Sequence, residues 1–223
     1  MKKVTTALTG ALLLAGSTLV LAQDPVKVDP AHYKVILENA SVRVLGVDYA
    51  SGAKSPMHSH PDAMVVALSA SKVRFTMPDK TTQDSDMPNE GAMYTPAGSH
   101  SGQIMSSTAT KALVIEFKGA GGKATLPTSR PGMTIKVLAE GARGMAYRST
   151  ADAKFAEPAG TKHDYDQVVI ALNGTTGMSL SIDGKPAKTT WARGDVQFIG
   201  RGTAHEAKNT SGKPVDFIIV AIK

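Results

Sequence analysis

An internal repeat constrains the fold of this chain more than any other feature. Residues 100–118 align without a gap with residues 205–223, at an offset of 105 residues. Each copy begins with His, passes through a small polar turn and ends in an apolar strand closed by Lys. Upstream, residues 65–68 resemble residues 169–172. Such a chain is expected to fold as two similar units of about 95 residues, the size of one small β-barrel or sandwich.

Short segments separated by turn residues dominate the sequence beyond the N-terminus. Polar and apolar residues alternate along residues 72–77 and 178–182, and the second segment leads into Asp183-Gly184, which is typical of a tight hairpin. Residues 112–117 and 215–222 are almost continuously apolar, as in strands that are buried on both faces. No amphipathic helical pattern of about ten or more residues follows the N-terminal segment. The sequence therefore predicts an all-β fold of two tandem small β-barrels.

The first residues have the composition of a cleavable export signal. Lys2 and Lys3 precede an apolar stretch, residues 7–22, which ends in small residues. The stretch is too short, and too interrupted by Thr, Gly and Ser, for a stable membrane span. We therefore expect cleavage between Ala22 and Gln23 and a mature chain that is periplasmic or secreted, since the short two-lysine start is typical of bacteria.

Charge and cysteine content exclude several classes of function. Lys and Arg number 25 against 19 Asp and Glu, a formal charge of +6 that is spread along the chain. No basic run with interleaved aromatic residues appears, so the sequence does not indicate a nucleic-acid-binding protein. The chain has no Cys, which excludes disulfides, thiolate metal sites and cysteine nucleophiles. A metal would have to be held by His, carboxylate, amide or Met side chains.

Turn-forming residues separate the two repeats. Gly119-Ala120-Gly121-Gly122 follows the first copy, and Pro131-Gly132 precedes the second. The expected organisation is a signal peptide (1–22), an N-terminal barrel (23–118), a linker (119–132) and a C-terminal barrel (133–223).

Five of the six histidines fall at corresponding places in the two halves: His58, His60, His100, His163 and His205. In the first half, His58-Ser59-His60 places two imidazoles on one face of a strand, because side chains two residues apart point the same way. The Pro96-Ala97-Gly98-Ser99 turn then leads His100 into a later strand.

The corresponding part of the second half carries a recognisable motif over residues 194–209. Gly194 is followed by five residues, Gly200-Arg201-Gly202, two residues, His205, three residues and Asn209. This is similar to the second motif of the cupin superfamily, with Gly200 in place of Pro, and His58-Ser59-His60 is similar to the start of the first motif. Over residues 33–223 the chain resembles a bicupin. The resemblance implies two barrels of the double-stranded β-helix (jelly-roll) type, a metal site and a homo-oligomer such as a dimer.

The glutamate of the first cupin motif is missing from both halves. In the first half its place falls at Ala63 or Met64, and the nearest carboxylate belongs to Asp62. The resemblance then implies a three-histidine metal site in the first barrel, formed by His58, His60 and His100.

The second half offers a weaker set of ligands. Gln167 stands where the family has Glu, which gives His163 the second His position and Thr161 the first. The resulting set is His163, Gln167 and His205. An alternative register pairs His163 with His58 and Tyr165 with His60, and the sequence leaves both registers open.

Three neutral imidazoles suit one divalent transition metal, namely Fe, Mn, Ni, Zn or Cu. Without a carboxylate ligand the metal would keep its full positive charge, which favours a small anionic molecule as its ligand. Candidate ligand-binding residues are Arg74, on the strand after the first motif, and Asp62 and Met64 beside the histidines. Asp62 is the nearest candidate acid–base group, whereas a solvated strand face would explain Arg74 equally well.

Three classes of function are compatible with these features. The first is a metal-dependent enzyme that resembles the dioxygenases and related enzymes of the cupin superfamily and acts on a small anionic molecule. The alternative is a non-catalytic periplasmic protein that binds a small ligand or a metal, which the missing Glu in both halves favours. A structural module is the third reading, and no stable membrane span or nucleic-acid partner is expected.

Overall fold

The computed structural model describes residues 23–172 and 175–223, and these residues are almost entirely β-structure. The expected signal peptide therefore lies outside the described residues. Among the described residues the one helix is short, α1 (Pro25–Val28), and it begins where the Asp24 side chain accepts a hydrogen bond from the Val26 N–H, with Pro25 at its first turn. Within the described ranges, no helix is long and apolar enough to cross a membrane.

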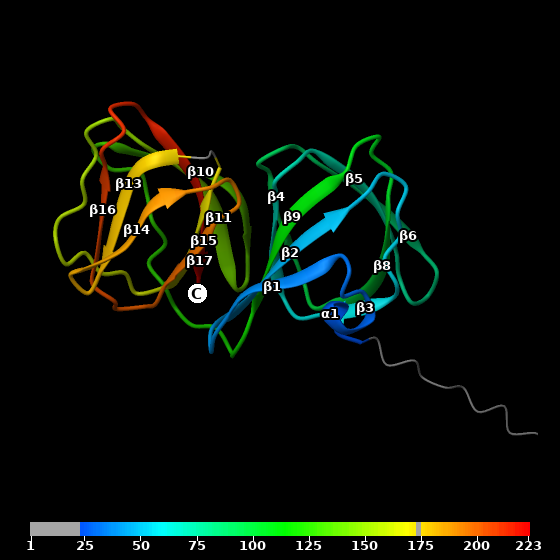
Figure 1. Cartoon of the computed structure of the whole chain (residues 1–223). Coiled ribbons are helices and arrows are strands. Elements are labelled where there is room, and N and C mark those ends of the chain that lie inside the picture. The colour runs from blue at the N-terminus through cyan, green and yellow to red at the C-terminus, as the bar shows by residue number, and fades with distance from the viewer. Residues whose placement is uncertain (1–22, 173–174) are drawn as a thin grey trace, which may run out of the picture.

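The N-terminal half contains two sheets (Figure 1). Its strands are β1 (Tyr33–Glu38), β2 (Val42–Tyr49), β3 (His58–His60), β4 (Ala63–Ala67), β5 (Ser71–Thr76), β6 (Thr82–Met87), β7 (Ala92–Thr95), β8 (Gly98–Ile104) and β9 (Thr110–Phe117). One sheet has the order β1-β2-β9-β4-β7 and the other β3-β8-β5-β6. Together they enclose an interior, as a jelly-roll barrel does.

The C-terminal half repeats most of this plan. Its strands are β10 (Met133–Gly141), β11 (Gly144–Ala151), β12 (Asp166–Ala171), β13 (Thr175–Ile182), β14 (Lys185–Trp191), β15 (Val196–Ile199), β16 (His205–Asn209) and β17 (Val215–Ile222). The sheet orders β10-β11-β17-β12-β15 and β14-β13-β16 match those of the first half, except that an isolated bridge between Thr161 and His205 stands in place of the β3–β8 pairing. The prediction of two tandem all-β barrels is therefore confirmed.

The predicted hairpin at residues 183–184 joins β13 to β14. Asp183 and Gly184 both have positive φ angles, 49° and 71°, and Ile182 pairs with Lys185 across the turn. Two positive φ angles give the tight turn the twist that antiparallel strands need, which explains the Asp-Gly sequence.

Strand β9 shows why its sequence is almost continuously apolar. Val114 and Glu116 line a cavity inside the N-terminal barrel, whereas Leu113 and Ile115 belong to an apolar core on the opposite face. Both faces of the strand are thus buried.

The apolar core that contains Leu113 and Ile115 lies between the two barrels, which sit side by side in Figure 1. It contains buried residues of both halves: Val42, Val44, Met64, Val66, Leu113, Ile115, Phe117, Ala146, Val168, Ile170, Leu172, Ile218, Val220 and Ile222. Glu90 of the first half also forms ion pairs with Arg148 (3.0 Å) and Arg193 (2.8 Å) of the second. The two barrels are therefore packed against each other through a shared interface and are not connected by the linker alone.

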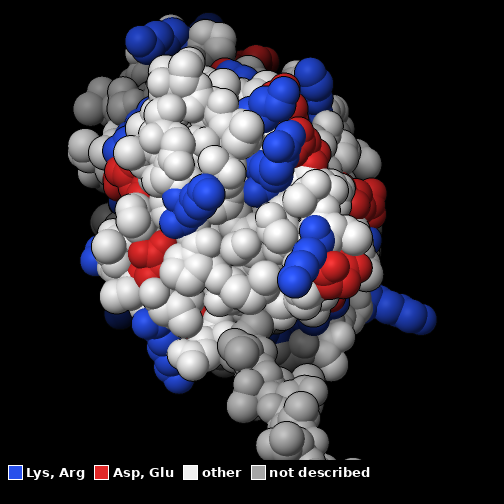
Figure 2. Space-filling view, turned by 90° about the vertical axis from the view of Figure 1, so that its right-hand side faces the viewer, with Lys and Arg blue, Asp and Glu red and all other residues white. Residues whose placement is uncertain are grey.

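Figure 2 shows the outer end of the N-terminal barrel, where Lys and Arg side chains lie among Asp and Glu side chains. This face carries no continuous basic surface of the kind that binds nucleic acid.

Candidate metal and ligand sites in the two barrels

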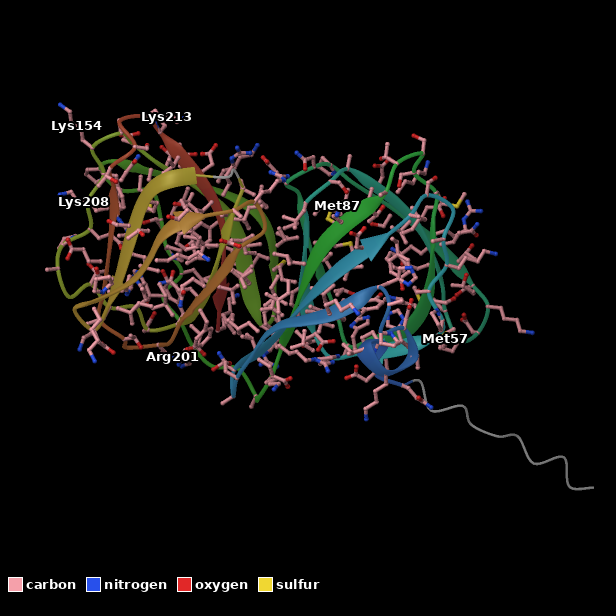
Figure 3. The ribbon with its side chains drawn as sticks, viewed as in Figure 1. Met57, Met87, Lys154, Arg201, Lys208 and Lys213 are labelled. Atoms are coloured by element: carbon pink, nitrogen blue, oxygen red, sulfur yellow. The ribbon has the colours of Figure 1, made fainter. Side chains whose placement is uncertain are left out.

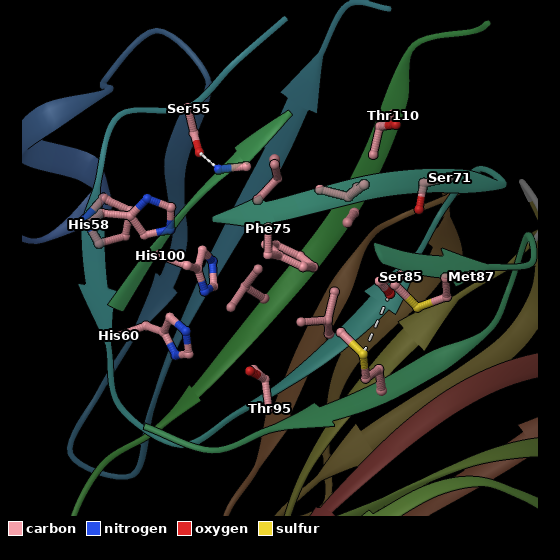
Figure 4. A pocket seen from close by; sticks show the side chains of 18 of the residues that line it. Ser55, His58, His60, Ser71, Phe75, Ser85, Met87, Thr95, His100 and Thr110 are labelled. Atoms are coloured by element: carbon pink, nitrogen blue, oxygen red, sulfur yellow. Dashed lines mark hydrogen bonds between the residues drawn. The ribbon is translucent and has the colours of Figure 1, made fainter. Parts of the chain in front are cut away.

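The antiparallel pairing of β3 with β8 brings three histidines of the N-terminal barrel together. His58 lies directly opposite His100, and His60, two residues further along β3, points to the same side. The ring centroids are 4.8 Å apart for His58 and His100, 4.9 Å for His60 and His100, and 6.5 Å for His58 and His60. Figure 4 shows these rings at one end of a pocket, with Phe75 beside His100.

Backbone carbonyl groups determine which ring nitrogen carries the proton in His58 and His60, and the Tyr33 hydroxyl lies 3.5 Å from the other nitrogen of His58. The Nδ1 of His58 lies 2.9 Å from the carbonyl oxygen of Pro56, and the Nδ1 of His60 lies 2.8 Å from that of Pro61. Each contact requires a proton on Nδ1, which leaves the lone pair on Nε2. Nε2 is therefore the nitrogen that either ring can offer to a metal.

Burial favours the neutral form of His58 and His100. It lowers the pKa of His58, although the hydrogen bond with the Pro56 carbonyl partly opposes this change. Burial, together with the neighbouring imidazoles, lowers the pKa of His100 to about 3. Because a metal binds the neutral imidazole, these rings are in the binding form at neutral pH without the loss of a proton.

A cavity of about 490 Å³ extends from the three rings into the N-terminal barrel. Its walls are mostly apolar, and Met87 reaches into the barrel interior in Figure 3. The lysines labelled in the same figure lie on the surface of the other barrel. The polar side chains in the lining include the three histidines and Glu116. A cavity of this size and character suits a small organic molecule rather than a bare ion alone.

In the C-terminal barrel, Thr161 takes the position of the first motif histidine. A bridge pairs Thr161 with His205, as His58 pairs with His100. His163 therefore corresponds to His60, and the alternative register through Tyr165 does not occur. The Tyr165 ring instead stacks on His163 with a centroid distance of 4.8 Å.

Glu157, His163 and His205 form a compact cluster in this second barrel. Their ligand atoms all lie within 4.8 Å of one another. In the part of the chain that the structure describes, no other group of three His, Cys, Asp or Glu side chains is this compact. The Glu157 Oε2 lies 3.8 Å from the His205 Nε2. The expected ligand Gln167 borders this cluster, with its side-chain amide 3.4 Å from the same imidazole nitrogen.

Sequence reasoning missed Glu157 because it lies outside both motifs. Its position becomes clear only from the strand pairing, since Glu157 is the structural counterpart of Ser55. The Ser55 hydroxyl accepts a hydrogen bond from the Gly102 N–H (2.7 Å), and the Glu157 carboxylate accepts one from the Ala207 N–H (3.1 Å). The second barrel thus obtains a carboxylate from a position that holds a hydroxyl in the first.

The surroundings of the second cluster differ from those of the first. Burial and the neighbouring His205 lower the pKa of His163 to about 4. Arg130 forms an ion pair with Glu157 and so contributes a positive charge beside the buried carboxylate. The adjoining cavity measures only about 60 Å³ and is lined by large side chains that include Phe155 and Trp191. This site has room for an ion but not for an organic ligand.

The structure places the three candidate ligand-binding residues away from the cavity. Arg74 is exposed, does not line the cavity, and donates two hydrogen bonds of 2.7 and 2.9 Å to Asp84, the residue opposite it on β6. Met64 is fully buried in the core between the barrels, because alternate residues of β4 face opposite sides. Asp62 accepts a hydrogen bond from the Ala97 N–H (2.7 Å).

Asp62 therefore has a structural contact that the sequence did not indicate. In the second barrel, Asp166 accepts a hydrogen bond from the Arg201 N–H at the same distance, 2.7 Å. Both carboxylates hold the turn that precedes the last motif histidine, His100 or His205. This occupation weakens the interpretation of Asp62 as an acid–base group.

Comparison with known proteins identifies the fold. No protein-family model matches the chain, and no curated protein matches it. Among solved structures, AerE from Microcystis aeruginosa matches with a TM-score of 0.65 and 13% identity, over 86% of this chain and 97% of that one. An oxalate decarboxylase variant from B. subtilis matches with a TM-score of 0.62 and 9% identity, over 85% and 71%.

A third similar structure is that of a cupin barrel protein. A cupin 2 conserved barrel domain protein from Leptotrichia buccalis matches with a TM-score of 0.57 and 11% identity, over 86% of this chain and 88% of that one. At such low identities the similarity establishes the fold alone. The protein is therefore an all-β protein with the cupin fold, present as two tandem barrels.

Proposed function

We propose that the protein is a metal-dependent cupin enzyme that acts on a small, largely apolar molecule with an anionic group, bound in the N-terminal barrel. One observation carries this proposal: His58, His60 and His100 stand at the end of a cavity of about 490 Å³. The imidazoles supply a metal site, and the cavity supplies room for an organic molecule next to it.

The donor set fits a divalent transition metal. Three neutral nitrogen ligands leave coordination positions open and do not cancel the charge of the ion, so an anionic group of the ligand could bind it directly. The bound metal would act as a Lewis acid or redox centre for an oxygenase or related reaction. The apolar walls exclude water and hold the rest of the molecule, which strengthens electrostatic interactions inside the barrel.

The second barrel supports the proposal in a different way. Glu157, His163 and His205 form a cluster suited to a metal ion, but the cavity beside it measures only about 60 Å³. We therefore assign ligand binding to the first barrel and, to the second, a metal ion that serves mainly to hold the barrel together.

A non-catalytic binding protein is the second candidate, favoured by one specific observation. Asp62, the nearest acid–base candidate in the sequence, is occupied by the Ala97 N–H in a turn. Turnover of a bound molecule would separate the two candidates, since a binding protein would release it unchanged.

Export of the mature chain to the periplasm or beyond is also part of the proposal. It is supported by the two lysines and the apolar stretch of residues 7–22. N-terminal sequencing of the protein recovered from a bacterial periplasm is expected to begin at Gln23, and a start at Met1 would contradict this.

Metal analysis of untagged protein tests the main proposal. We expect about one equivalent of Fe, Mn, Ni, Zn or Cu in each barrel, and we expect the variant His58→Ala with His100→Ala to lose the first. His32→Ala serves as a control, because His32 lies outside both clusters and contacts Asp29. A wild-type protein that neither holds nor takes up metal would contradict the proposal.

A further inference from the structure

Glu116 is a buried carboxylate that the proposed function leaves without a role. It lies near the end of β9, has a relative exposure of 2%, and belongs to the lining of the same cavity as the three histidines. Buried carboxylates are rare unless they are paired and hydrogen-bonded, so both oxygens of this group need a partner.

Only one of the two oxygens has a hydrogen-bond partner within the described part of the chain. The Oε2 atom accepts a hydrogen bond from the Nε of Arg43 at 2.6 Å, and Arg43 in turn also contacts Asp24. No hydrogen-bond donor among the described residues reaches the buried Oε1 atom. The charge of Glu116 is thus compensated by Arg43, while one acceptor remains unused.

At this pair of opposing strand positions, the two barrels carry their polar side chain on different strands. In the first barrel, Glu116 of β9 lies directly opposite Ala63 of β4, the place where the cupin motif has its glutamate. In the second barrel, Gln167 of β12 lies opposite Ala221 of β17. Residues directly opposite one another on paired strands project to the same side of a sheet. The first barrel therefore has its carboxylate on the same inner face as the motif position, but one strand further along the sheet.

The Glu116 carboxylate is also separate from the cluster of possible metal ligands formed by Glu157, His163 and His205. A group of three metal-ligating side chains within 4.8 Å of one another occurs, in the described residues, in the second barrel and does not include Glu116. A ligand that fills the cavity could reach both the histidines and Glu116, since all of them line it.

We propose that Glu116 Oε1 accepts a hydrogen bond from a hydroxyl or N–H group of the molecule bound in the N-terminal barrel. The ligand class is then a small molecule with an anionic group at one place and a hydrogen-bond donor at another. This inference rests on the proposed function in placing the ligand in that cavity. A site built to accept a hydrogen bond discriminates strongly against analogues that lack the donor, because the buried acceptor then stays unpaired.

Matched probe molecules that differ by one hydroxyl group test this inference. On metal-loaded protein the probes are benzoate and its three monohydroxylated isomers, and benzoate is measured again after metal removal. On protein stripped of metal with a chelator they are toluene and the three cresols, which do not depend on a metal. In each set we expect at least one hydroxylated isomer to bind about tenfold more tightly than its parent, as measured by ligand-observed NMR titration.

Two variants connect that preference to Glu116. Glu116→Gln keeps the shape and an acceptor for Arg43, and we expect it to reduce the preference to about threefold or less, since a neutral acceptor is weaker than a carboxylate. Glu116→Met removes the acceptor, and the preference should disappear while toluene binding persists. Glu140→Gln is the matched control, because Glu140 is exposed and pairs with Lys223.

Three results would overturn the inference: no hydroxylated isomer is preferred in the cresol set, the preference survives in Glu116→Gln, or Glu116→Gln loses metal. The last result would make Glu116 a metal ligand instead. Failure of the proposed function is distinguishable, because it would appear as benzoate binding that is absent or unchanged by metal removal, whereas the cresol set needs no metal.

Discussion

At the scale of single residues, Glu157 combines a structural contact with a candidate metal-binding role, and the first barrel shows how to separate them. Glu157→Ser would keep an acceptor for the Ala207 N–H, as Ser55 does for Gly102. The same change removes the carboxylate from His163 and His205. We expect the affinity of the second site for Mn²⁺ or Zn²⁺ to fall at least tenfold. Because the change also removes the ion-pair partner of Arg130, the stability should fall as well.

This prediction is best measured by calorimetric titration in a His58→Ala, His100→Ala background, so that only the second site binds metal. Glu140→Ser in the same background is the control, since Glu140 is exposed and distant from the cluster in the strand order. An unchanged affinity in Glu157→Ser would show that the carboxylate does not bind the metal.

The histidines could be predicted from the sequence, but the carboxylates could not. His58 and His60 are two residues apart on a strand, a local pattern that fixes their common direction. Glu157 and Glu116 reach their sites through pairing with β16 and β4, strands that are distant in sequence. Arg74 and Met64 illustrate the opposite error, because proximity in sequence to the motif did not place either side chain in the cavity.

At the scale of elements, the turn before β8 depends on one carboxylate. Asp62→Ala would remove the acceptor of the Ala97 N–H, and we expect the free energy of unfolding to fall by about 1 kcal/mol. Because this turn leads directly into His100, the metal affinity of the first site should fall as well. Urea titration and metal titration measure the two effects.

Asp166→Ala is the matched variant in the second barrel, where Asp166 accepts from the Arg201 N–H. It should lower stability by a similar amount and affect the second metal site instead of the first. If Asp62→Ala left both the stability and the metal affinity unchanged, the carboxylate would not be what holds this turn.

The strands themselves were largely predictable, whereas their order was not. Alternation along residues 72–77 and the Asp183-Gly184 turn are local signals, and the structure confirms both a strand and a hairpin there. The pairing of β4 with β9 joins segments that are about fifty residues apart, and no local pattern specifies such a partner. The repeat supplied the missing constraint, because both halves had to adopt one topology.

At the scale of the whole molecule, ion pairs connect the two barrels and give the stability a defined pH dependence. Asp216 of β17 accepts hydrogen bonds from Arg148 and Thr150, and Arg148 also reaches Glu90 of the first barrel. Burial opposes ionisation of Asp216, but these hydrogen bonds outweigh it and hold its pKa below the usual 3.8. A lowered folded-state pKa contributes stability above the unfolded pKa, and that contribution is lost as the pH falls through the folded value.

We therefore expect Asp216→Asn to lower the free energy of unfolding by roughly 1 kcal/mol at pH 7. The difference from wild type should shrink as the pH falls below about 4, because the wild-type carboxyl becomes protonated and loses its advantage. Urea unfolding at a series of pH values measures this difference. A constant difference across that range would mean that the charge of Asp216 is not the cause.

The shared core between the barrels leads to the last prediction, that the two barrels unfold together. Leu113 and Ile218 come from opposite barrels and are both buried in this core. Truncation of either one to Ala should cost about 2–5 kcal/mol, and each barrel alone would expose the face that the other now covers.

The single tryptophan, Trp191, lies in the core of the second barrel, so its fluorescence reports on that barrel alone. In Leu113→Ala, a first-barrel variant, we expect the fluorescence transition and the circular dichroism transition to shift together to lower urea concentration. A fluorescence midpoint that stayed at the wild-type value would show that the barrels are independent folding units.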